Sequence, residues 1–200
     1  DKTIPDFTIP EQDVSGALVT FSEVSVVKNH EAVRKPCDIT LRRGQKLLLA
    51  GPNGIGKSTL LRALVGQADA GMQITEGVRV GYYAQDFSGL DFNDTAYQAL
   101  EKAMSVPNNE ELRSVAARFL LRGDTLANKV GALSEGQKGL LCYARFVLQK
   151  PGLLIMDEPT NHINFRHLPV IARALDEYQG GLIVVSHAPD FVKDIRFTTT

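Results

Sequence analysis

The stretch Gly51-Pro52-Asn53-Gly54-Ile55-Gly56-Lys57-Ser58-Thr59 decides the fold, because it fits the pattern GxxxxGK[ST]. Its glycines let the backbone curl, so that several N–H groups point into one concavity that suits phosphate oxygens. The Lys57 ammonium can reach the β- and γ-phosphates of a nucleotide, and the Ser58 hydroxyl can bind Mg²⁺. We predict that residues 51–59 bind a nucleotide, the alternative being an ordinary glycine turn with a solvated lysine.

Apolar segments flank this loop in the order that an α/β protein requires. Residues 46–50 form a short apolar run before it, which predicts a strand. The residues after it have helical spacing up to Gly66, with apolar positions Leu60, Leu61, Leu64 and Val65. Such a helix adds its positive N-terminal end to the phosphate site.

The rest of the chain alternates predicted strands with predicted helices. Residues 17–27 and 78–83 predict strands, and the continuous apolar runs 153–156 and 182–185 are typical of strands buried on both faces of a parallel sheet. Helices are predicted over 107–123, from Ser134 to before Pro151, and on a face with Leu168, Ile171, Leu175 and Tyr178. This order predicts an α/β fold with a mostly parallel sheet.

Composition sets limits on the class of protein. The 200 residues suit one globular domain with a small subdomain, and the net charge of -1 gives no argument for nucleic acid or an anionic membrane. No apolar run reaches the roughly 20 residues of a membrane helix, so we expect no direct membrane insertion. Cys37 and Cys142 lie far apart, which predicts buried thiols in a reducing compartment.

The first residues form a segment of a different kind. Residues 1–16 contain Pro5 and Pro10 among polar residues, which predicts an extended lead-in outside the core. The chain begins with Asp1 and has no recognisable signal peptide. We interpret it as a piece of a longer, cytosolic protein.

Two carboxylates follow the apolar run at 153–156. Ligands gather at the carboxyl ends of parallel strands, so Asp157 and Glu158 are candidates for the chemistry. Asp157 is predicted to hold Mg²⁺, and Glu158 to orient or deprotonate an attacking water. The alternative is a solvated strand end.

Three further motifs occur in a fixed order. Tyr-Tyr-Ala-Gln ends at Gln85, Leu-Ser-Glu-Gly-Gln spans residues 133–137, and Val-Val-Ser-His ends at His187. With the two motifs above, they make the chain resemble the ATP-binding cassette (ABC) domains from about Ala17 onward. The resemblance implies a P-loop NTPase cassette over 17–200. It would have a RecA-like, mostly parallel sheet core, a small antiparallel β-subdomain and a helical subdomain at about 86–150.

The resemblance also implies a mechanism in which two cassettes enclose two ATP molecules. Each ATP would lie between the phosphate loop of one cassette and the signature of the other, so a second ABC cassette is the implied partner. ATP and Mg²⁺ are the implied cofactors. The implied roles are catalytic for Glu158 and His187, Mg²⁺-binding for Ser58, Gln85 and Asp157, and contact with the partner's ATP for Ser134, Glu135, Gly136 and Gln137.

The segment Glu158-Pro159-Thr160-Asn161-His162 is similar to that of the ABC-F group, which are soluble twin-cassette proteins. Many of them act on the ribosome. The resemblance implies a C-terminal cassette preceded by a linker remnant at 1–16, with ATPase activity and a cytoplasmic, ribosomal role. The alternatives are a nucleotide-binding subunit of a membrane transporter and an ATP-gated interaction module with little hydrolysis.

The chain departs from the family pattern at three places. Glu135 replaces a glycine, and its carboxylate would repel a triphosphate unless it points away. Ile163-Asn164 replaces the usual Leu-Asp, which predicts weaker coupling of hydrolysis. Residues 26–30 lack the aromatic residue that usually stacks on adenine, which leaves GTP open as an alternative. We expect slow hydrolysis by the isolated domain.

Overall fold

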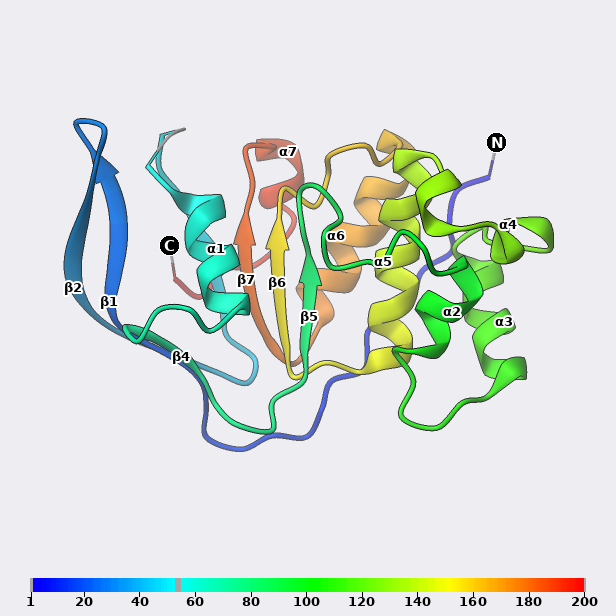
Figure 1. Ribbon diagram of the computed structural model, residues 1–200, viewed down its shortest axis with the longest axis horizontal. Coiled ribbons are helices and arrows are strands. Elements are labelled where there is room, and N and C mark those ends of the chain that lie inside the picture. Colours follow the sequence, from blue (N-terminus) through cyan, green and yellow to red (C-terminus); the bar gives the residue numbers. More distant parts are fainter. Residues whose placement is uncertain (1, 53–54, 200) are drawn as a thin grey trace.

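The computed structural model describes residues 2–52 and 55–199 and contains two sheets (Figure 1). The antiparallel sheet has the order β2-β1-β4, formed by β1 (Ala17–Lys28), β2 (Glu31–Arg42) and β4 (Met72–Ile74). The parallel sheet has the order β3-β7-β6-β5, formed by β3 (Lys46–Leu49), β5 (Val80–Tyr83), β6 (Leu153–Asp157) and β7 (Gly181–Val185). The predicted strands therefore form, and the parallel pairing is confirmed.

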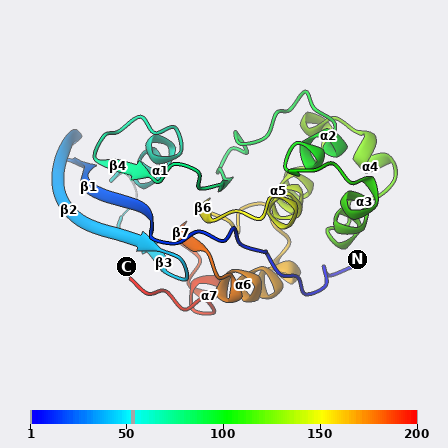
Figure 2. The same ribbon diagram turned by 90° about the horizontal axis from the view of Figure 1, so that it is seen from below.

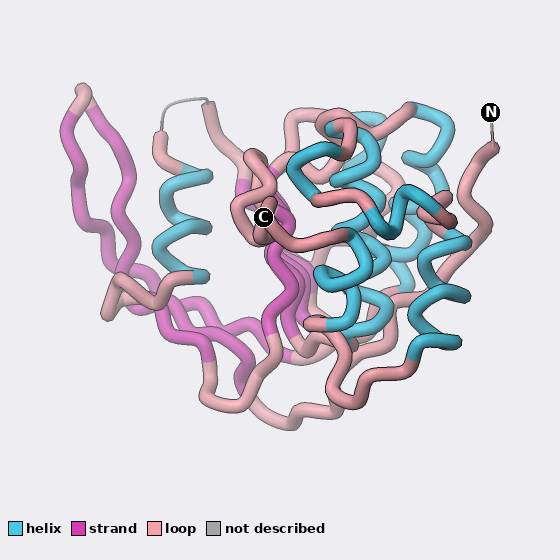
Figure 3. Tube along the Cα trace, turned by 45° about the vertical axis from the view of Figure 1, so that its right-hand side comes forward, coloured by secondary structure: helices cyan, strands magenta, loops and turns pink. Residues whose placement is uncertain are grey.

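Helices surround the parallel sheet on three sides. Helix α1 (Lys57–Val65) covers one face, while α6 (Leu168–Glu177) and α7 (Pro189–Val192) cover the other (Figure 2). A helical lobe lies beyond the β5 edge, at the opposite end of the molecule from the β1–β2 hairpin (Figure 3). It comprises α2 (Ala96–Glu101), α3 (Asn109–Arg118), α4 (Asp124–Ala127) and α5 (Glu135–Gln149).

The parallel sheet is the centre of the core. Every residue of β6 and β7 is buried, as their continuous apolar runs predicted. Alternate side chains face different layers: Leu153 and Ile155 pack in the cluster with α1, whereas Leu154 and Met156 pack with the helical lobe. The sheet therefore packs against α1 on one face and against the cluster that contains the helical lobe on the other, and this fixes both relative to the carboxyl ends of its strands.

Helix ends follow local sequence signals. Asn108 caps α3, since its side-chain oxygen accepts a hydrogen bond from the backbone N–H of Glu111. The predicted helix over 107–123 is longer than α3, because the backbone already leaves the helix after Arg118 and Leu120 has a positive φ of 64°. Gly123 lies before α4 and does not terminate α3.

The lead-in does not lie outside the core, and that prediction is wrong. Ile4, Phe7 and Ile9 are 2%, 6% and 1% exposed. The Phe7 ring contacts Phe119 edge-on at 4.8 Å between centroids, and the backbone N–H of Ile4 donates to His167 Nδ1 at 3.2 Å. The apolar residues beside and between the prolines are buried without regular secondary structure. Through Phe119 and His167 the segment contacts both the helical lobe and the turn before α6.

Candidate active site

A polar cavity of about 520 Å³ opens where α1 begins beside the carboxyl ends of β5, β6 and β7. Ligands gather at this edge of a parallel sheet. The cavity brings together seven of the predicted residues, and its lining is Gly56, Lys57, Ser58, Thr59, Gln85, Glu158, Asn161, Val185 and His187. Of the remaining phosphate-loop residues, Gly51, Pro52 and Ile55 do not line it, and Asn53 and Gly54 lie outside the described residues.

The amino end of α1 suits an anion. Gly56 precedes it with a φ of 98°, a left-handed conformation that favours glycine. No side chain of the described residues caps this end, and no acidic residue lies in the first turn. The first N–H groups of a helix need partners, and phosphate oxygens supply them at a positive helix end. The Lys57 ammonium lies here and donates to the Gly51 carbonyl.

Asp157 and Ser58 form the second part of the site. The Ser58 hydroxyl donates to Asp157 Oδ1 at 3.2 Å, and the aspartate residue is only 1% exposed. Burial raises the pKa of Asp157, and the Ser58 hydrogen bond partly opposes this. Gln85 lines the cavity together with Ser58, whereas Asp157 does not line it and is joined to it through the Ser58 hydroxyl. One hydroxyl, one carboxylate and one amide fit Mg²⁺, which binds proteins through few oxygen ligands and completes its shell with water and phosphate.

Glu158 is held against His187. The pairing of β6 with β7 brings them together, since Asp157 lies opposite Val185 and the Glu158 N–H donates to the Val185 carbonyl at 2.8 Å. One carboxylate oxygen accepts from the His187 backbone N–H at 3.3 Å, and the other lies 3.4 Å from His187 Nε2. Glu158 has a φ of 54°, and strained backbone of this kind clusters at functional sites.

The signature residues lie apart from this cavity. Residues 133–137 are not in its lining and sit at the start of α5. Ser134 Oγ accepts from the Gln137 N–H at 3.1 Å, while Gln137 Oε1 accepts from the Ser134 N–H at 2.9 Å, which completes a capping box. The signature residues therefore lie outside this cavity, at a helix start that is capped by its own side chains.

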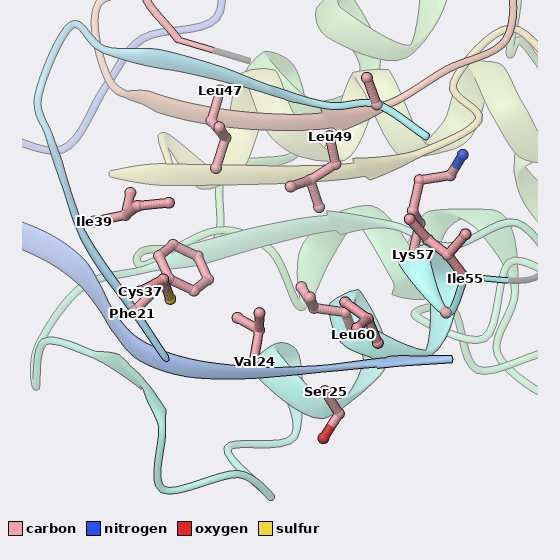
Figure 4. A pocket seen from close by; sticks show the side chains of 13 residues that line it. Phe21, Val24, Ser25, Cys37, Ile39, Leu47, Leu49, Ile55, Lys57 and Leu60 are labelled. Carbon is pink, nitrogen blue, oxygen red and sulfur yellow. The ribbon is translucent and has the colours of Figure 1, made fainter. Parts of the chain in front are cut away.

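An apolar cavity of about 180 Å³ lies on the other side of α1, between the two sheets (Figure 4). Its lining includes Phe21, Val24, Cys37, Ile39, Leu47, Leu49 and Leu60. Figure 4 shows the Lys57 nitrogen pointing away from it. Gly56 and Lys57 line both cavities, but phosphates need polar partners, so the polar cavity is the candidate phosphate site.

Asn161 is a polar cavity residue to which the sequence assigned no role. It follows the acidic pair by three positions, and its backbone N–H donates to the Glu158 carbonyl at 3.1 Å. The turn after β6 thus places an amide side chain beside the catalytic candidate. The available signal was its position within Glu-Pro-Thr-Asn-His. That segment indicated a resemblance to the ABC-F proteins but did not indicate that Asn161 lies in the cavity.

Solved structures with a similar fold include ATP-binding cassettes. A dimeric, post-hydrolysis state of the ATP-binding cassette MJ0796 bound to ADP and Pi has a TM-score of 0.67 at 22% identity, covering 88% of this chain and 91% of that one. The archaeal ribosome recycling factor aABCE1, in complex with the ribosomal stalk protein aP1, has a TM-score of 0.66 at 21% identity, covering 96% and 38%. These likenesses show the fold alone.

Sequence relatives identify the family. The probable ATP-binding protein YbiT of Escherichia coli O157:H7 is 40% identical over 166 residues, which are 80% of this chain and 31% of that protein. ATP-binding cassette sub-family F member 2 of Mus musculus is 30% identical over 194 residues, which are 94% of this chain and 31% of that protein. The chain thus spans about a third of the length of these relatives. Residues 34–161 match the family model described as ABC transporter, and the chain belongs to that family, with F sub-family members among its relatives.

Proposed function

We propose that this cassette binds ATP with Mg²⁺ and hydrolyses it to ADP and phosphate. The observation that carries the proposal is Glu158, held by His187 in the cavity that also contains Lys57 and Ser58. The MJ0796 structure, with its ADP and Pi, supports the same chemistry in a protein of this fold. When bound, Mg²⁺ supplies neutralising charge at the β- and γ-phosphates.

The chain's own residues perform the remaining work. Lys57 and the amino end of α1 bind the phosphates, and Glu158 accepts a proton from a water whose oxygen attacks the γ-phosphorus. The bond between that phosphorus and the β–γ bridging oxygen breaks, and ADP leaves. His187 keeps the Glu158 carboxylate directed into the cavity through the two contacts described above.

A second cassette completes the site. The signature of this chain lies away from its own cavity, and the relatives are about three times as long as the chain. We propose that the cassette works in a twin-cassette protein as the C-terminal cassette, with residues 1–16 as the end of the linker. Each ATP is then enclosed by both cassettes, and the isolated chain hydrolyses ATP slowly.

We further propose that the whole protein acts on the ribosome, in the cytoplasm. The ABC-F relatives and the similarity of Glu158-Pro159-Thr160-Asn161-His162 to that group support this role. The fold likeness to an archaeal ribosome recycling factor is in accord with it. ATP binding would close the two cassettes and hydrolysis would reopen them, a switch driven by different affinities of the two states for ATP. Within the described residues every helix is too short or too polar to cross a membrane.

The test is Glu158→Gln in the full-length protein. ATP binding should remain, because the phosphate contacts are intact, and single-turnover hydrolysis should fall by about 10² to 10⁴, the usual contribution of a general base. Glu101→Gln is the matched control, since that glutamate is exposed at the end of α2. Hydrolysis by Glu158→Gln at the wild-type rate would refute the catalytic assignment.

The ribosomal role has a separate readout. With ATP, the Glu158→Gln protein should stay closed and co-sediment with ribosomes, whereas the wild type should dissociate. If ATP is trapped without co-sedimentation, the ATPase assignment stands and the ribosomal role is wrong. If both forms bind ATP and neither hydrolyses it, the cassette is an ATP-gated binding module.

A further inference from the structure

Lys138 is a lysine that the fold buries one helical turn into α5. Its side chain is 8% exposed. The ammonium donates to Glu135 Oε1 at 2.9 Å and lies 4.8 Å from the centroid of the Phe92 ring. A lysine is almost never buried without a partner, and here a carboxylate and an aromatic face share the charge.

The partner carboxylate stands at a sensitive position. Glu135 occupies the first turn of α5, directly after the Ser134 cap, and its side chain is 51% exposed. The hydrogen bond from Lys138 lowers the pKa of Glu135, so the carboxylate stays charged. An unneutralised negative charge at this helix end would oppose the phosphates that the end is suited to attract.

Helix α5 has no room to shift so as to carry the Glu135 carboxylate away from a bound phosphate. A Cβ on Gly136 would lie 3.2 Å from the His162 carbonyl oxygen, and one on Gly139 would lie 2.4 Å from Ile163 Cδ1. The amino end of α5 is therefore packed directly on the turn that follows Glu158. Any accommodation of Glu135 has to come from its side chain and from the groups that hold it.

We propose that Lys138 is a positioning residue that draws the Glu135 carboxylate back along α5 and offsets its charge, so that the altered signature still accepts the partner cassette's ATP. The proposal rests on the proposed function, in which this signature acts on the second nucleotide. It explains how a carboxylate is tolerated in the first turn of a helix that would face phosphates. It also assigns Phe92 a part, because its ring is a second contact of the ammonium besides Glu135.

The experiment compares three variants of the full-length protein with the wild type by steady-state ATP hydrolysis. Lys138→Met should lower kcat/KM by about tenfold, the effect of one partly screened charge near the phosphates. Glu135→Gly added to Lys138→Met should restore the rate, and Lys138→Arg should keep it. The Lys138→Met defect should also shrink at about 1 M salt, where screening acts within about 3 Å.

Two results would overturn the proposal. One is a full rate in Lys138→Met at low salt, and the other is a loss of the same size with and without Glu135→Gly, which would mark a packing role. Thermal unfolding of each variant checks that it is folded. If Lys138→Met does not fold, the Glu135→Gln variant is measured in its place. Its kcat/KM should equal or exceed that of the wild type, because the negative charge is removed and Lys138 remains. A lower kcat/KM would contradict the reasoning.

Ser134→Arg separates this idea from the function on which it rests. If Ser134→Arg abolishes hydrolysis and Glu135→Gly fails to rescue Lys138→Met, the signature acts as proposed and only the positioning role is wrong. If Ser134→Arg hydrolyses ATP at the wild-type rate, the signature has no part in the reaction, and both ideas fall together.

Discussion

Replacing Phe7 by alanine tests whether the lead-in is part of the folded domain. The side chain is 6% exposed and packs against Phe119 and Tyr143, with ring centroids at 4.8 and 6.3 Å. Removal of a buried phenylalanine side chain costs about 3–5 kcal/mol. The segment has no regular secondary structure and can relax around the gap, so we expect about 3 kcal/mol, the lower end of that range.

The assay is urea unfolding of this chain, with the free energy of unfolding extrapolated to zero denaturant. Phe165→Ala is the matched control, because it removes the same atoms from a side chain that is 80% exposed. The control should change stability by less than about 0.5 kcal/mol. A Phe7→Ala effect no larger than that of Phe165→Ala would refute the reasoning and return residues 1–16 to the status of a loose lead-in.

Three further predictions concern single side chains. Tyr83→Phe should raise the free energy of unfolding by about 1 kcal/mol, because Tyr83 Oη is buried without a hydrogen-bond partner among the described residues. A lower midpoint temperature in thermal unfolding would contradict this. Gly139→Ala should cost about 1–3 kcal/mol in urea unfolding despite the better helix propensity of alanine, because the new Cβ meets Ile163 at 2.4 Å, and greater stability would show that the contact yields. Ser58→Ala should weaken ATP binding about tenfold with Mg²⁺ and much less in EDTA, since it removes a predicted metal ligand; equal losses in calorimetric titrations under both conditions would exclude that role.

The elements that could be predicted carry their signals within a short stretch. The helix after the phosphate loop has apolar spacing and stops at Gly66, and α5 begins with a serine cap followed three residues later by Gln137. The strands β6 and β7 appear as continuous apolar runs. Each of these signals depends only on neighbouring residues in the sequence, so the elements could be predicted without knowledge of the fold.

Strand β2 had no such signal. Its sequence carries charged residues and contains Pro36, both of which argue against a strand, and in the structure it is largely exposed. It forms because β1 supplies its hydrogen-bond partners and because it is the edge of its sheet, where a proline is tolerated. The lead-in is similar, since its burial depends on α3 and α5, which lie more than a hundred residues further along the chain.

The sequence by itself determined the residue types of the site and their order, because the motif of residues 51–59 and the acidic end of β6 are continuous stretches with one chemical use. Only the tertiary structure decided which of these groups meet. The parallel pairing of β6 with β7 brings His187 against Glu158, and the packing of α5 brings Lys138 against Phe92. Contacts between distant segments are set by how apolar faces bury one another, and no single segment contains that information.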